Sequence, residues 1–212
     1  KTINLIKPEE IAQAVLDVLG INKTIKHKTL FIGPNYSASY VEVIPTQKTG
    51  VVAKLIDVRM DYAHNEQVLA DIMQRTKVEV TTSRPIPESF LQSGRISKII
   101  YKTDEFDQDF IQLIKNSSMP HVFVCLSPDN LSKEREKNFD TLISYFNEKE
   151  LVESNKKRLK IENIEDIKIK SGKKIVCGDK TYDSYFDLND RKDLTHFYLD
   201  LDYFRVYTEE DE

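Results

Sequence analysis

Residues suited to binding a nucleotide follow two short apolar runs of the chain. Gly33-Pro-Asn-Tyr-Ser37 comes directly after Lys28-Thr-Leu-Phe-Ile32, and Asp57-Val-Arg59 ends the run that begins at Val51. A glycine lets a ligand approach the backbone, and an acid after the next strand accepts hydrogen bonds from the hydroxyls of a ribose. Gly33 and Asp57 are 24 positions apart, close to the roughly 20 residues typical of dinucleotide sites. The spacing therefore predicts a nucleotide-type site.

Two further polar segments follow apolar runs in the same way. They are Thr103-Asp104 and Ser127-Pro-Asp129. In an open parallel sheet a ligand binds outside the carboxyl ends of the strands. We therefore expect Gly33, Asp57 and Asp104 to lie around one cleft.

The elements that would position these residues alternate along the chain. Strands are predicted at 28–33, 51–57, 78–82, 97–101 and 121–126, and helices at 8–20, 65–77 and 106–114. A fourth helix is predicted from the cap at Ser127-Pro-Asp129 to about Asn155. The last of these helices would bury Phe139, Leu142, Ile143 and Phe146. Strands without polar alternation are buried on both faces, as in parallel sheets with βαβ connections. The pattern predicts an α/β fold with a Rossmann-like, mostly parallel sheet flanked by helices.

The pattern changes near residue 159. Lysine-rich and aspartate-rich segments follow, and Phe197, Leu199, Leu201 and Phe204 alternate with other residues. Alternation of this kind is typical of an antiparallel strand. We therefore expect a Rossmann-like core over 1–158, and over 159–212 antiparallel strands that complete the sheet, followed by an acidic tail.

Composition narrows the classes of protein. The chain has 212 residues, 40% hydrophobic and 31% charged, with a formal net charge of −4 and two cysteines. There is no apolar run of about 20 residues and no signal peptide, and the cysteines show no metal-ligand spacing. These features predict a cytoplasmic protein with no membrane segment and no metal. The Lys156-Lys-Arg-Leu-Lys160 run is interpreted as either a phosphate contact or a solvated face.

Three segments resemble a known family. Leu30-Phe-Ile-Gly33, Leu55-Ile-Asp-Val-Arg59 and Ser97-Lys-Ile-Ile-Tyr-Lys-Thr-Asp104 are similar to motifs of Rossmann-fold methyltransferases, most nearly the cap-specific RNA 2′-O-methyltransferases of poxviruses. The resemblance covers roughly residues 9 to 130. It implies S-adenosylmethionine as cofactor, with Gly33, Asn35, Asp57 and Arg59 around it. It also implies that Asp104 stands in the catalytic position, with Lys102 beside it.

Departures from the family leave more than one function open. The turn Pro34–Ser37 lacks a second glycine, and Ser127-Pro-Asp129 stands where a catalytic lysine would follow the fifth strand. The first hypothesis is a methyltransferase acting on RNA or another nucleotide-bearing substrate. The second is a catalytically inactive methyltransferase-like subunit that binds or regulates a larger nucleic-acid-processing partner. A third, a metal-dependent hydrolase using Asp57, Asp61 and Asp104, lacks an Asp…Glu-x-Lys spacing.

Structural interpretations of the same residues also remain open. Asp57 could cap a turn or pair with Arg59, and Asp104 could cap the helix that follows it. His64 is interpreted as a surface or capping residue.

Overall fold

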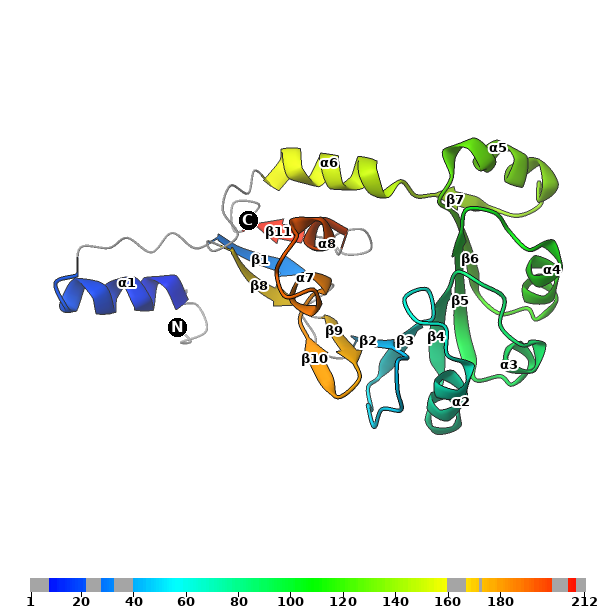
Figure 1. Cartoon of the computed structure of the whole chain (residues 1–212), viewed down its shortest axis with the longest axis horizontal. Helices are drawn as coiled ribbons and strands as arrows, with labels where there is room; N and C mark the ends of the chain where they lie inside the picture. The colour runs from blue at the N-terminus through cyan, green and yellow to red at the C-terminus, as the bar shows by residue number, and fades with distance from the viewer. Residues whose placement is uncertain are drawn as a thin grey trace.

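The computed structural model describes residues 8–21, 28–32, 40–159, 167–171, 173–199 and 206–208, and an eight-stranded sheet organises most of them (Figure 1). In spatial order its strands are β10 (Lys180–Tyr182), β9 (Lys173–Cys177), β2 (Tyr40–Ile44), β3 (Leu55–Arg59), β4 (Val78–Thr82), β5 (Ile96–Thr103), β6 (His121–Cys125) and β7 (Ile143–Tyr145). Every neighbouring pair from β9 to β7 is parallel, whereas β10 is antiparallel to β9. The predicted α/β fold with a mostly parallel sheet and antiparallel C-terminal strands is confirmed.

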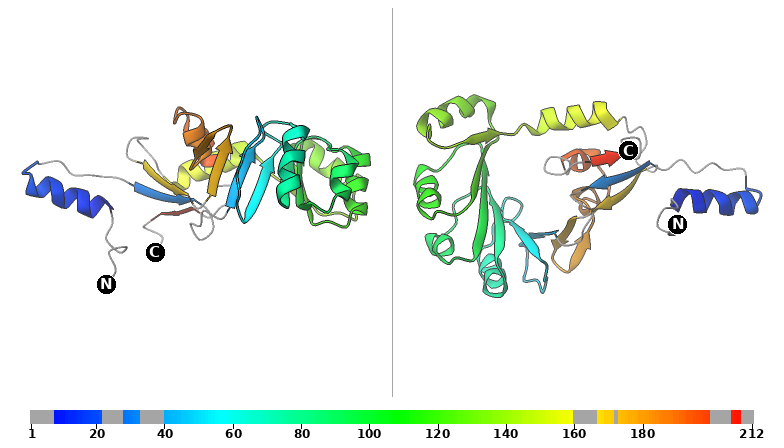
Figure 2. Two further views of the ribbon diagram at one scale, coloured as in Figure 1. Left: turned by 90° about the horizontal axis from the view of Figure 1, so that it is seen from below. Right: turned by 180° about the vertical axis from the view of Figure 1, so that it is seen from behind.

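The helices that connect β3 to β7 all lie on one face of this sheet (Figures 1 and 2). They are α2 (Glu66–Arg75), α3 (Glu88–Gln92), α4 (Gln108–Asn116) and α5 (Pro128–Lys137). Strands β2 to β7 neighbour one another in chain order, and crossovers of one hand then place every helix on the same side. The reversal of strand order that opens a ligand crevice in dinucleotide-binding sheets does not occur among these six strands.

The main core lies between this face and the helices. Ile56, Val58, Val80, Ile99 and Phe123 are buried on the strands. The helices contribute residues at three- and four-residue spacing: Val68, Leu69, Ile72 and Met73 from α2, and Phe110, Ile111 and Ile114 from α4. The helices predicted at 65–77 and 106–114 are therefore confirmed.

Strand β1 (Lys28–Ile32) belongs to a different sheet. It pairs in parallel with β8 (Ile167–Ser171) and antiparallel with β11 (Val206–Thr208). The first predicted strand is therefore separate from the sheet that holds β3.

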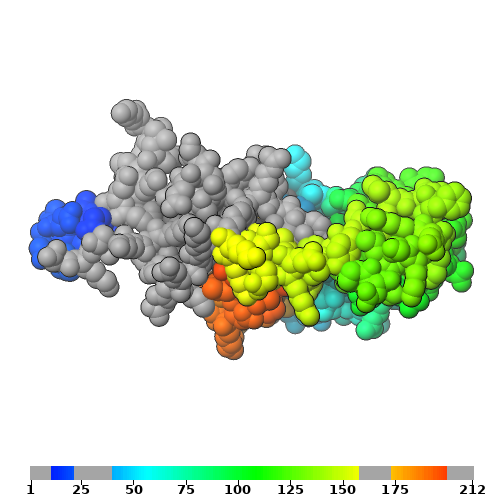
Figure 3. Space-filling view, turned by 90° about the horizontal axis from the view of Figure 1, so that it is seen from above, coloured from blue at the N-terminus to red at the C-terminus, as the bar shows by residue number. Residues whose placement is uncertain are grey.

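Among the described residues, four helices lie outside the β3–β7 connections: α1 (Pro8–Val18), α6 (Glu148–Leu159), α7 (Tyr185–Leu188) and α8 (Leu194–Leu199). Gly20, at φ +67°, follows α1 and fits the predicted end of that helix. Helix α6 packs beside α8, where Asn155 Nδ2 donates to the Tyr198 carbonyl at 3.2 Å, and Figure 3 shows α6 in yellow against the orange C-terminal segment. In the described part of the chain, no helix has both the length and the apolar character needed to cross a membrane.

The single helix predicted from the cap at Ser127-Pro-Asp129 to about Asn155 is wrong in its extent, although its cap is confirmed. Ser127 caps α5, accepting from Asn130 N at 3.3 Å, and this helix ends at Lys137. A turn and the short strand β7 follow before α6 begins at Glu148. Phe139 and Leu142 are 89% and 86% exposed, whereas Ile143 is buried in β7. The helical spacing of these apolar residues therefore arises from a loop joined to a strand.

Two other expectations need correction. Strand β2 was absent from the predicted set, and the strand predicted at 51–57 lies at 55–59. Phe197 and Leu199 belong to helix α8 and not to an alternating strand. Leu201 and Phe204 lie outside the described residues.

Candidate functional site

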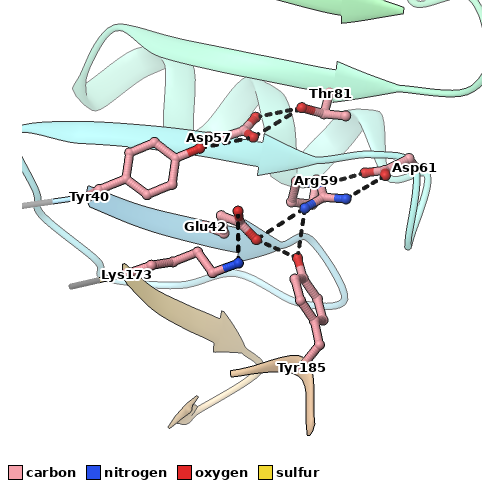
Figure 4. Close-up of polar contacts among 8 residues, drawn as sticks. All are labelled: Tyr40, Glu42, Asp57, Arg59, Asp61, Thr81, Lys173 and Tyr185. Atoms are coloured by element: carbon pink, nitrogen blue, oxygen red, sulfur yellow. Dashed lines mark hydrogen bonds and ion pairs between the residues drawn. The ribbon is translucent and has the colours of Figure 1, made fainter. Parts of the chain in front are cut away.

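Charged side chains gather on the sheet face opposite helices α2–α5. Along β2 and β3, Val43 and Val58 belong to the main core, so the alternate residues Glu42, Asp57 and Arg59 point to the other face. We call the group shown in Figure 4 the polar cluster; it consists of Tyr40, Glu42, Asp57, Arg59, Asp61, Thr81, Lys173 and Tyr185. Most of these residues are buried, Glu42 at 2% exposure and Arg59 at 6%.

Arg59 is the centre of the polar cluster. Its guanidinium donates to both carboxylate oxygens of Asp61, at 2.8 and 2.7 Å. Nη1 donates to Glu42 Oε2 at 3.1 Å and to the Tyr185 hydroxyl at 3.0 Å. The guanidinium also lies over the ring of Tyr62, 4.6 Å from its centroid. Bidentate pairing and stacking of this kind hold a guanidinium in one orientation.

Glu42 receives the second cation of the cluster. Lys173 Nζ lies 3.5 Å from Glu42 Oε1, and the Tyr185 hydroxyl donates to Oε2 at 2.5 Å. Burial acts to raise the pKa of Glu42, but the charges of Lys173 and Arg59 and the hydrogen bond from Tyr185 outweigh it and lower the pKa. Glu42 is therefore the ionised partner of two buried cations.

Asp57 is the acid without a cation of its own. The Thr81 hydroxyl donates to its two oxygens at 3.1 and 3.0 Å, and the Tyr40 hydroxyl lies 3.4 Å from Oδ2. Burial raises the pKa of Asp57 to about 7, and Glu42 and Asp61 add to this, against the opposing effects of Arg59 and Thr81. Because Glu42 and Asp61 already balance Arg59 and Lys173, an ionised Asp57 would leave one uncompensated negative charge in the interior.

Two of the expected structural contacts, a pair between Asp57 and Arg59 and a helix cap at Asp104, are not formed. Arg59 pairs with Glu42 and Asp61 instead of Asp57. The cap of α4 is Asp107, whose Oδ1 accepts from Phe110 N at 2.9 Å, and not Asp104. His64 lies 3.5 Å from Glu66, at the start of α2.

Of the remaining predicted site residues, Lys102 and Asp104 lie outside the polar cluster. Gly33 and Asn35 lie outside the described residues. Lys102, on β5, places its Nζ 4.5 Å from the centroid of the Phe146 ring. Asp104 is exposed directly after β5, and its carbonyl accepts from Asn130 Nδ2 at 3.3 Å. The assignment of Gly33, Asn35, Lys102 and Asp104 to a site therefore stays a prediction.

No group of three or more His, Cys, Asp or Glu residues is arranged to hold a metal ion within the ranges that the structure describes. Two of the three acids in the metal-dependent hypothesis already accept hydrogen bonds. Asp61 accepts from the Arg59 guanidinium, and Asp57 accepts from the hydroxyls of Thr81 and Tyr40.

Five members of the polar cluster were not among the predicted site residues. They are Tyr40, Glu42, Thr81, Lys173 and Tyr185. Glu42 could have been noticed, because Tyr-Val-Glu-Val-Ile places one acid inside an apolar strand, and a buried charge needs a partner. Its partners Lys173 and Tyr185 follow it by more than 100 positions, and no local pattern connects them.

The polar groups of the polar cluster have their partners within the cluster itself. Its charged groups bind one another, and the Tyr40 and Thr81 hydroxyls occupy the carboxylate of Asp57. Asp57 is 3% exposed, so its carboxylate does not face a ribose from solvent. The residues as placed do not fit the ribose-binding role that the resemblance implies for Asp57.

Fold and cluster together define an α/β protein with a parallel sheet, helices on one face and a buried ionic network on the other. Comparison of the chain with protein family models, with curated proteins and with solved structures finds no match.

Proposed function

We propose that this chain is a non-catalytic, methyltransferase-like binding subunit that acts in the cytoplasm on a larger nucleic-acid-processing partner. The observation that carries the proposal is the state of Asp57, which is buried and already accepts hydrogen bonds from Thr81 and Tyr40. An acid that binds the ribose of a nucleotide must present free acceptor positions to the ligand. Here such a ligand would have to displace two hydroxyl groups from a buried carboxyl group.

The strand order supports the same proposal. Strands β2 to β7 follow one another without a reversal, so this part of the sheet lacks the switch point at which ligand crevices form. A fold of this class does not fix a function, and related sheets serve as enzymes and as binding modules.

Ligand titration of the purified full chain tests the absence of a cofactor site. We expect no shift of the thermal midpoint with millimolar S-adenosylmethionine or S-adenosylhomocysteine. A ligand at 100 times its dissociation constant would add about 2.7 kcal/mol to the free energy of unfolding. A saturable upward shift that is lost in Asp57→Asn would overturn the proposal.

Purification from the native source tests whether the chain binds a partner protein. We expect a stoichiometric complex with a protein that acts on nucleic acid. A chain that elutes without any other protein, at low salt and with chemical cross-linking, would contradict the proposal.

The second candidate function is an S-adenosylmethionine-dependent methyltransferase acting on RNA. It is favoured by Asp104, whose exposed side chain follows the central strand β5 at its carboxyl end, next to the first turn of α5. Transfer of labelled methyl groups to capped RNA is the direct assay. Under this candidate Asp104→Ala and Lys102→Ala each lower the rate by at least about 100-fold, as expected for loss of a proton-transfer group, whereas exposed Asp129→Ala leaves it unchanged.

A further inference from the structure

Asp57 lies between two other acids on neighbouring strands of the large sheet. It is opposite Glu42 of β2 on one side and opposite Glu79 of β4 on the other. Neighbouring strands are about 4.8 Å apart, and side chains paired across them point to the same face. Glu42 and Asp57 are buried, and Glu79 is half-buried. Like charges at this spacing, together with burial, favour the protonated form of the central carboxyl group.

The direct partners of Asp57 are uncharged. Its oxygens accept hydrogen bonds from the hydroxyls of Thr81 on β4 and Tyr40 on β2 (Figure 4). The other charged or titratable groups on the elements around it are Glu42, Arg59, Asp61, Tyr62, Glu79, Lys173 and Tyr185. While Asp57 is protonated, two buried carboxylates of this group are matched by two buried cations. Loss of the proton leaves a third buried carboxylate directly beside Glu42.

Glu42 also attaches the C-terminal edge of the sheet, by which we mean β9, β10 and α7, residues 173–188. Lys173 Nζ of β9 lies 3.5 Å from Glu42 Oε1, and the Tyr185 hydroxyl of α7 donates to Oε2 at 2.5 Å. The carboxylate that neighbours Asp57 is therefore the same one that binds two elements of the C-terminal edge.

From this arrangement we infer that the C-terminal edge opens from β2 as Asp57 loses its proton. An ionised Asp57 competes with Glu42 for the cation of Lys173, which weakens the contact that closes the edge. Opening admits water, which solvates both carboxylates and removes the cost of their burial. It also uncovers Ile44 of β2 and Ile175 of β9, which pack together in the closed edge. The sheet therefore exposes an apolar surface as the pH rises.

The sign of the pH dependence follows from the two forms of the edge. In the closed edge Asp57 keeps its proton up to about pH 7, whereas a carboxyl group exposed to water in the open edge titrates near about 3.9. Opening between these values releases a proton. The ratio of open to closed edge should therefore rise by up to about tenfold per pH unit between about pH 4 and 7, and level off above that.

Native-state hydrogen exchange on the full chain at pH 5, 6.5 and 8 tests the inference. The wild type is compared with Asp57→Asn at each pH, so that the effect of pH on the chemistry of exchange cancels. From pH 5 to pH 8, the ratio of wild-type to variant exchange rates in residues 173–188 should rise at least about tenfold. Glu79→Gln is the matched control. It removes an acid beside Asp57 but keeps Asp57 itself, so its edge should retain the wild-type dependence on pH.

Low concentrations of urea separate opening of the edge from unfolding of the whole sheet. A local opening exposes little surface, so exchange in residues 173–188 should hardly respond to urea. Exchange in β5 and β6 requires a larger unfolding and should accelerate as urea is added. Circular dichroism melts at pH 5 establish that the variants are folded. The protection of the wild-type edge at the three pH values tests the inference without any variant.

The inference is overturned by any one of three results. In the first, exchange of the wild-type edge, corrected for its intrinsic rate, is the same at pH 5 and pH 8. In the second, Asp57→Asn keeps the wild-type dependence on pH, or Glu79→Gln abolishes it. In the third, the edge shows the same protection and the same response to urea as β5 and β6, so that it opens only when the sheet unfolds. No ligand or partner protein enters these experiments, so their outcome is independent of the proposed function.

Discussion

The buried charges of the polar cluster set its chemistry residue by residue. Glu42 and Asp61 balance Arg59 and Lys173, and every one of these groups has a partner within 3.5 Å. Buried ion pairs are costly to desolvate, and removing one partner is far worse than replacing the whole set with apolar residues. Single substitutions of these four charged residues should therefore be more damaging than their small changes in volume suggest.

Asp57 should make stability depend on pH. Burial raises the pKa of its carboxyl group to about 7, whereas an aspartate in an unfolded chain titrates near about 3.9. Between these values the folded chain holds a proton that the unfolded chain releases, so the free energy of unfolding falls as the pH rises. The contribution is complete below about pH 4 and is lost as the pH passes about 7.

Asp57→Asn should remove this dependence. A neutral amide replaces the group that would otherwise ionise, so above pH 7 the variant should be more stable than the wild type, by about 1 to 3 kcal/mol. Urea unfolding at pH 5, 6.5 and 8 measures the effect. A variant that is less stable than the wild type at pH 8, with an unchanged pH slope, would show that Asp57 is already ionised in the folded protein at pH 5, and that burial does not raise its pKa.

Tyr185→Phe should isolate the contribution of one hydroxyl. The Tyr185 hydroxyl donates to Glu42 and accepts from Arg59, both buried, while the ring stacks on Tyr62 with centroids 4.6 Å apart. Phenylalanine keeps the stacking and leaves two buried charged groups each short of one hydrogen bond, at a cost of about 1 to 3 kcal/mol. The urea midpoint measures it, with Tyr182→Phe, at a half-buried position, as the control. Equal midpoints for the two variants would mean that water replaces the hydroxyl.

At the scale of elements, sequence reasoning works where local chemistry decides the outcome. Helix α2 has both a period of three to four and a cap at Asn65, whose Oδ1 accepts from Val68 N at 3.2 Å. Strands β4 to β6 are rich in β-branched residues, which favour strands, and buried residues recur along each of them. These elements could be predicted because their own residues determine them.

The same reasoning fails where two elements share one apolar period. Phe139, Leu142 and Ile143 have helical spacing, yet the Asn138 amide donates to the Glu134 carbonyl as the last bond of α5, and the chain then turns. Strand β7 forms because β6 offers it a parallel edge, through the pair Phe123 and Ile143. That edge exists only in the folded sheet, so no pattern within residues 139–146 reveals it.

Two substitutions test that Phe139 lies in an exposed loop and Ile143 in a buried strand. Phe139→Ser removes a side chain that is 89% exposed and should change the free energy of unfolding by less than about 0.5 kcal/mol. Ile143→Ala empties a position that is 1% exposed and should cost about 2 to 5 kcal/mol. Denaturant unfolding compares them. A large loss for Phe139→Ser would show instead that the helix continues through residues 139–146, as the sequence predicts.

For the whole molecule, the polar cluster joins distant parts of the chain. Strands β2 and β3 contribute Glu42 and Arg59, whereas β9 and α7 contribute Lys173 and Tyr185. Strand β9 pairs with β2 through five residues of parallel register. The ionic contacts lie directly beside this pairing, so they link the C-terminal strands to the rest of the sheet. Contacts across so many positions are set by topology, which is why Lys173 and Tyr185 escaped prediction although strands β3 to β6 did not.

Lys173→Met should weaken the attachment of the C-terminal strands β9 and β10 to the rest of the sheet. Methionine keeps much of the volume but leaves Glu42 buried with Arg59 as its one remaining cation, and breaking a buried pair costs about 3 to 5 kcal/mol. Strand β10 and helix α7 are attached to the sheet through β9. The rate of backbone amide hydrogen exchange should therefore rise at least tenfold in residues 173–188 and in β2, while the amides of β5 and β6 keep their wild-type protection. Lys174→Met is the matched control, since Lys174 points to the other face and pairs with half-exposed Asp183. A uniform rise over all strands would indicate that the sheet unfolds as one cooperative body, and that the polar cluster stabilises the whole molecule instead of one edge.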